Sequence, residues 1–149
     1  MKLKREPRPE LSREQAQLLA AVYMAFEEGM ESCARLTQRR EAGEPAAELR
    51  DEALEVARTI AYVSRAAFES VVHRKLLESI PDESRSPVKP LRVLSRLGYA
   101  LSALAEDDPE PDALLSPEEV DGLVAKHGIE DWVNYNREMI ARVEARTHE

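Results

Sequence analysis

Cysteine, long apolar runs and positive charge are all scarce in this sequence. Its 149 residues contain one cysteine, Cys33, which excludes an internal disulfide and favours a reducing, cytoplasmic compartment. No apolar run approaches the roughly 18 residues that a membrane span needs, and residues 1–10 contain no apolar signal-peptide core. We therefore expect a soluble protein with no membrane partner.

Lys and Arg number 21 against 29 Asp and Glu, a formal net charge of −8. Generic nucleic-acid binding needs a basic surface, so this balance argues against it. The sequence also lacks a Ser/His/Asp set, a phosphate-binding glycine loop and a dinucleotide fingerprint. Its three histidines do not pair with the cysteine at metal-ligand spacing. No strong catalytic motif is present.

The length fits one domain with a sizeable core. Residues 1–11 are charged and carry two prolines, so they are expected to form a flexible tail before a single helical domain at 12–149. Ser12 and Gln15 match a helix-capping box, and Gly43 matches a helix end. Between them, apolar residues recur at steps of three and four: Leu19, Val22, Phe26, Met30, Cys33 and Leu36.

Residues 46–80 contain no Gly or Pro and predict a long second helix. Such a helix is about 50 Å long, whereas a domain of this size is roughly 40 Å across. The helix therefore either bends, near Ser64 or Ser70, or projects and is covered by a partner, and a homodimer is the favoured expectation.

A linker at 81–90 precedes a helix with leucines at 91, 94, 97, 101 and 104, followed by an acidic loop at 106–112. Ser116, Pro117 and Glu119 begin another helix, which Gly128 ends before a final helix. The fold prediction is an all-α bundle of four or five helices, with a long second helix and a C-terminal helical hairpin.

Acidic residues on the first two predicted helices are the one pattern that suggests catalysis. Residues 27–31 read EExxE and residues 48–51 read ExxD. Carboxylates that converge from two antiparallel helices suit Mg²⁺, which takes oxygen ligands and accompanies phosphates. The pattern resembles the MazG-like family of helical nucleotide pyrophosphohydrolases, over residues 27–51 only. The resemblance implies a Mg²⁺ cofactor with these ligands: Glu27, Glu28, Glu31, Glu48 and Asp51.

Helical spacing gives a competing interpretation of these acids. At about 100° per residue, Glu27 flanks the apolar side of its helix, while Glu28 and Glu31 lie farther round. Glu48 and Asp51 lie opposite the apolar side of the second helix. On this interpretation the acids form a solvated surface that binds no metal.

Two further patterns concern partners. Residues 117–147 fit the small-turn pattern of a helix-turn-helix DNA-binding unit, although residues 116–149 contain eight acids against four Lys or Arg. Lys89, Arg92 and Arg96 step by three and four, so they form a basic stripe along one helix. Such a stripe suits an acidic partner or a phosphate. The alternative is that it packs near the acidic loop of its own chain or of a dimer mate.

The sequence thus favours a non-catalytic, cytoplasmic interaction or regulatory module, dimeric and without a cofactor. Its expected protein-binding residues are Lys89, Arg92 and Arg96, with an acidic protein as the expected partner. The alternatives are the Mg²⁺-dependent pyrophosphohydrolase and the helix-turn-helix regulator.

Overall fold

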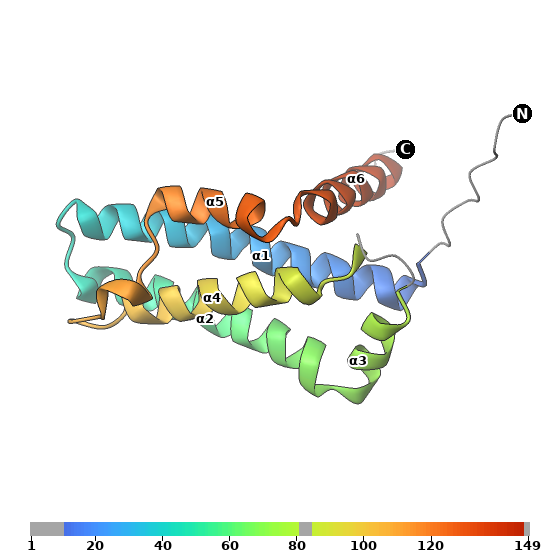
Figure 1. Ribbon diagram of the computed structural model, residues 1–149, viewed down its shortest axis with the longest axis horizontal. Coiled ribbons are helices and arrows are strands. Elements are labelled where there is room, and N and C mark those ends of the chain that lie inside the picture. Colours follow the sequence, from blue (N-terminus) through green and yellow to red (C-terminus); the bar gives the residue numbers. More distant parts are fainter. Residues whose placement is uncertain (1–10, 81–84, 148–149) are drawn as a thin grey trace, which may run out of the picture.

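A computed structural model describes residues 11–80 and 85–147, and every regular element in these ranges is helical (Figure 1). The elements are α1 (Arg13–Glu41), α2 (Ala46–Glu69), α3 (Val71–Glu78), α4 (Val88–Leu104), the short 3₁₀ helix η2 (Pro111–Ala113), α5 (Pro117–His127) and α6 (Glu130–Thr147). The all-α prediction is therefore confirmed. Most of the tail predicted at 1–11 lies outside the described residues.

Local capping signals place several helix ends where the sequence predicts them. At the start of α1, the Ser12 hydroxyl accepts a hydrogen bond from the Gln15 N–H at 3.1 Å, and the Gln15 side chain accepts one from the Ser12 N–H at 2.8 Å. Ser116 and Glu119 form the same reciprocal pair at the start of α5. Gly128 follows α5 with a φ of +63°, a left-handed conformation that glycine adopts without strain.

The prediction of one continuous helix over residues 46–80 is wrong, and the alternative of a bend is correct. Ser70 has an extended backbone, with φ −72° and ψ 123°, which ends α2 and begins α3. Its hydroxyl accepts a hydrogen bond from the His73 N–H, and the Arg74 guanidinium donates to the Phe68 carbonyl at the end of α2. Serine competes in this way with helical hydrogen bonding. The break raises the number of described α-helices from the expected four or five to six.

The predicted C-terminal hairpin is also wrong, because α5 and α6 pack mainly on α1 and not on each other. They follow one another along α1, joined at Gly128 and Ile129 (Figure 1). Trp132 anchors α6 there: its ring centroid lies 5.6 Å from that of Phe26, edge to face, and 5.8 Å from that of Tyr23. Such aromatic pairs stabilise a contact beyond the area they bury.

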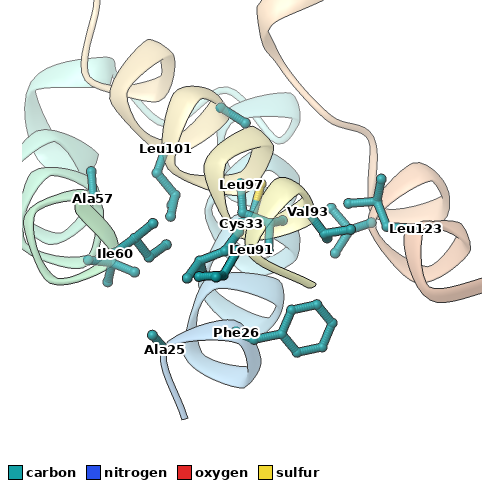
Figure 2. Close-up of a cluster of buried hydrophobic side chains, with 14 of the residues drawn as sticks. Ala25, Phe26, Cys33, Ala57, Ile60, Leu91, Val93, Leu97, Leu101 and Leu123 are labelled. Atoms are coloured by element: carbon teal, nitrogen blue, oxygen red, sulfur yellow. The ribbon is translucent and has the colours of Figure 1, made fainter. Parts of the chain in front are cut away.

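The core lies between α1, α2 and α4, which form the most extensive contacts of the fold. Figure 2 shows Ile60 and Ala57 of α2 pointing toward Leu97 and Leu101 of α4. Ile60 packs against two glycines: a Cβ at Gly29 of α1 would lie 2.9 Å from Ile60 Cδ1, and one at Gly98 of α4 would lie 3.0 Å from Ile60 Cγ2. The missing Cβ atoms allow three helices to approach the same side chain.

Across the described ranges, no helix combines the length and the apolar character that crossing a membrane requires.

This close packing gives a testable contrast between two helical glycines. Gly122 of α5 is exposed and a Cβ there would meet nothing within 4 Å, so Gly122→Ala should stabilise the fold by up to about 1 kcal/mol through helix propensity. Gly29→Ala should lower the free energy of unfolding by about 1 to 2 kcal/mol, because the added methyl overpacks the core against Ile60 and Leu97. Urea denaturation measures both values.

Adding Ile60→Val, which removes Cδ1, to Gly29→Ala should recover part of the loss. Equal stabilisation by the two glycine substitutions would contradict the packing argument.

Candidate functional site

Glu27, the first of the predicted metal ligands, belongs to a network that fixes α6 on α1. Its Oε1 accepts a hydrogen bond from the Tyr23 hydroxyl at 2.7 Å and another from the Arg137 guanidinium at 3.0 Å. The Arg137 Nε also donates to the Tyr23 oxygen at 3.1 Å. Burial and the bond to Glu27 raise the pKa of Tyr23, while Arg137 opposes them. Glu27 thus has a structural role that its position in the EExxE pattern did not indicate.

The other four predicted ligands, Glu28, Glu31, Glu48 and Asp51, are exposed. Glu31 lies 3.9 Å from Arg35 on its own helix. Across the residues that the structure describes, no three His, Cys, Asp or Glu side chains are placed to share a metal ion. The outward orientation agrees with the helical spacing, and the geometry provides no support for a Mg²⁺ site.

A different set of charges joins α1 to α2. Glu52 accepts hydrogen bonds from both Arg35 and Arg39, and Arg39 also pairs with Glu44 at 2.8 Å. The hydrogen bond to Glu44 and, to a smaller extent, the one to Glu52 raise the pKa of Arg39 above its ordinary value. Because these side chains are more than a third exposed, solvent weakens their contribution to stability. Glu52 of α2 therefore links the two helices through its ion pairs with Arg35 and Arg39 of α1.

The predicted basic stripe divides into two parts. Arg96 donates from Nη2 to the Asp112 carbonyl at 2.8 Å and from Nη1 to the Ala113 carbonyl at 2.9 Å, and so holds η2 against α4. Lys89 and Arg92 are exposed. The expectation that the stripe packs near the chain's own acidic loop therefore holds for Arg96, through backbone carbonyls of the η2 turn.

Two hollows meet at Arg92. The α4–α6 hollow, of about 420 Å³, lies between the first turns of α4 and α6 and includes Lys89, Arg92, Asp131 and Trp132 in its lining. The α4–α5 hollow, of about 410 Å³, is lined by further charged or titratable side chains: Arg92, Arg96, Glu119, Lys126 and His127. Both volumes fall in the range of small-ligand sites. Arg92 forms part of both walls.

Lys126 and His127 are members of this surface that the sequence argument did not single out. They lie at the end of α5, some thirty residues beyond Arg92 and Arg96 in the chain. Only the packing of α5 on α1 and α4 brings them beside the stripe. Basic residues are common in the last turn of a helix because they suit the negative end of its dipole, so the sequence alone does not mark Lys126 and His127 as part of a site.

The segment proposed as a helix-turn-helix has a different arrangement. In that motif the two helices pack together across a short turn, whereas α5 and α6 rest mainly on α1. Trp132 and Asn136, on the inner side of α6, are buried, and the Asn136 amide donates to the Trp132 carbonyl. The geometry gives the DNA-binding alternative no support.

Cys33 is a core residue. It is fully buried and free of any disulfide. Burial raises the pKa of its thiol from 9.0 to about 11, against smaller opposing effects of Thr37 and Arg96. Since the thiolate is the reactive form, this thiol is inert at neutral pH.

The shifted thiol predicts a pH dependence of stability. Well below pH 9 the thiol is protonated in both folded and unfolded chains, so its contribution is constant. Between pH 9 and about 11 the unfolded chain loses the proton first, which favours unfolding by about 2 to 3 kcal/mol in all. Urea denaturation across this interval should show a steeper loss for the wild type than for Cys33→Ala. Identical pH dependence in both proteins would refute this assignment.

No family model, curated protein or solved structure matches this chain in a significant way.

Proposed function

We propose that this chain is a non-catalytic protein-interaction module that binds an acidic segment of a partner protein. The binding residues are those that surround the two hollows, called here the basic surface: Lys89, Arg92, Arg96, Lys126 and His127. The observation that carries the proposal is the place of Arg92, which borders both hollows. An acidic chain laid across α4 would meet cationic side chains on each side of Arg92.

The balance of charge on this surface favours an anionic ligand. Lys and Arg side chains outnumber the acidic ones in the linings, which contribute only Asp131 and Glu119. Glu119 already accepts the Ser116 N–H as part of the α5 cap. Arginine suits carboxylates because its planar guanidinium can bind both oxygens at once.

The surface also offers apolar contact, which an interaction site needs because exposed ion pairs alone contribute little. Val88 is 45% exposed at the edge of the α4–α6 hollow, and Trp132 forms part of its wall. A protein segment with alternating acidic and apolar residues suits this combination. A nucleic acid suits it less well, because the chain's net charge of −8 repels phosphates.

We place this module in the cytoplasm, because its one cysteine is a buried free thiol that requires no oxidising compartment. We also propose that the chain forms a homodimer. Because the chain turns at Ser70, the length of the second helix gives no reason for a dimer; the exposed surface of α2 and α4 supports self-association instead.

A labelled peptide of alternating glutamate and leucine tests the basic surface. We expect it to bind the wild type at low salt and to dissociate as salt rises, because salt screens exposed charges. Arg92→Glu should weaken binding about tenfold or more, since it reverses the charge that both hollows share. Fluorescence anisotropy of the peptide measures affinity, and the single tryptophan, Trp132, reports on the α4–α6 hollow.

Arg50→Glu is the matched control, because it makes the same change in net charge at an exposed position of α2 that lines neither hollow. Its affinity should stay within about twofold of the wild type if the binding is local. Equal losses in the two variants would mean that net charge alone attracts the peptide, and the proposal would then be wrong.

A further inference from the structure

The outward sides of α2 and α4 form a surface that no other described element covers. α1 packs against both helices from within, α3 contacts α1 and α2, α5 and η2 contact α4, and α6 rests on α1. Between α2 and α4 runs an open groove of about 240 Å³, lined mostly by small side chains. We call the groove and its rims the α2–α4 face: Ala57, Ala61, Ser64, Ser95, Gly98, Tyr99 and Ser102, flanked by the exposed Arg58 and Arg65 of α2 and Arg92 of α4.

Exposed positions on α4 have the spacing of a coiled-coil contact. They recur at alternating steps of four and three from the start of α4 to just beyond its end: Val88, Arg92, Ser95, Tyr99, Ser102 and Glu106. A stripe at this spacing keeps facing a second helix laid along it. Small residues on either side of Tyr99 allow close approach, and Tyr99 itself is 58% exposed.

Charge is polarised along this face. On α4 the basic residues occupy the first half, and Glu106, Asp107 and Asp108 follow its end. α2 runs antiparallel to α4 (Figure 1). Arg58 and Arg65 outnumber Glu69 in its second half, and Glu48, Asp51, Glu52 and Glu55 outnumber Arg50 in its first. The basic parts of the two helices therefore lie toward one end of the face and the acidic parts toward the other.

We propose that a second copy of this chain docks on the α2–α4 face in antiparallel orientation, with the two-fold axis near Tyr99. Tyr99 is seven residues from Arg92 and seven from Glu106, so the axis places the basic end of each copy against the acidic end of the other. A two-fold axis forms both contacts at once. A parallel arrangement would place like charges together.

In this arrangement an arginine from the basic end of the second copy enters a third hollow. It has a volume of about 370 Å³, adjoins Tyr99 and is lined by three acids, Glu106, Asp108 and Glu110. Tyr99 borders both this acidic hollow and the groove. The apolar centre and the charged ends of the face thus adjoin one another, as a protein interface requires.

The dimensions of the face fit a modest interface. α2 has 24 residues and is about 36 Å long, and two adjacent helices are about 20 Å wide. The face therefore measures roughly 700 Å², close to the 800 Å² that each partner contributes to a standard interface. A dimer with an interface of this size should form at high protein concentration and dissociate on dilution.

Sedimentation velocity across a wide concentration range, at low and high salt, tests the dimer. The wild type should shift from monomer to dimer as concentration rises, and high salt should weaken the shift because it screens the charged ends. Tyr99→Arg should raise the dissociation constant about tenfold or more, since it places two like charges on the axis. Arg65→Glu should weaken the dimer as well, because it adds an acid to the basic end of the face.

Met24→Arg is the matched control: Met24 is 64% exposed on α1, outside the face, and the variant should dimerise like the wild type. A wild type that stays monomeric, or equal effects of Met24→Arg and Tyr99→Arg, would overturn the inference. The inference rests on the proposed interaction role, and the peptide assay separates the two. The Tyr99 ring lies 5.7 Å from the Arg96 guanidinium, so Arg65→Glu is the variant that separates them. Arg65 lines neither basic hollow, and an Arg65→Glu chain that dimerises less but still binds the acidic peptide supports both proposals. A wild type that dimerises without binding peptide removes the acidic-segment proposal alone.

Discussion

The arrangement of this domain depends on one side chain, Ile60, which packs against glycines on two different helices. Gly29 and Gly98 have no Cβ atoms, so α1 and α4 both approach α2 at the same level. This contact fixes α4 along α2, with Lys89 and Arg92 near α6 and the acidic loop at the far end. The basic surface and the polarised α2–α4 face both follow from that placement, because both are built on the same helix, α4.

Features that depend on neighbouring residues were predictable from the sequence. The reciprocal caps at Ser12 and Ser116 need only a side chain three residues away, and the structure contains both. The break at Ser70 was harder to locate, because Ser64 and Ser70 are both serines within one apolar pattern. What separates them is the Arg74 guanidinium, which satisfies the Phe68 carbonyl when α2 ends at Glu69. The predicted hairpin failed for a similar reason, since Trp132 packs on Tyr23 and Phe26 more than a hundred residues earlier.

The same distinction applies to the candidate site. The three- and four-residue steps of Lys89, Arg92 and Arg96 correctly placed them on α4. Spacing does not reveal that Arg96 is engaged by the carbonyls of Asp112 and Ala113, because the position of η2 depends on tertiary packing. Nor does it reveal that Glu27 meets Arg137 from the other end of the chain. A pattern of charges along a helix indicates which residues share a side of that helix. The groups that pair with these charges come from elsewhere in the fold.

Arg92 connects the two proposed interactions. It borders both basic hollows, and it also lies on the stripe that a second copy would cover with its acidic end. An acidic segment bound at the basic surface and the acidic end of a second copy would therefore draw on the same guanidinium. Thermodynamic linkage requires this effect to be reciprocal: if the segment weakens the dimer by some factor, the dimer weakens binding of the segment by the same factor. Competition of this kind would make the monomer the form that binds the acidic partner, and the dimer a form that withholds Arg92 from it.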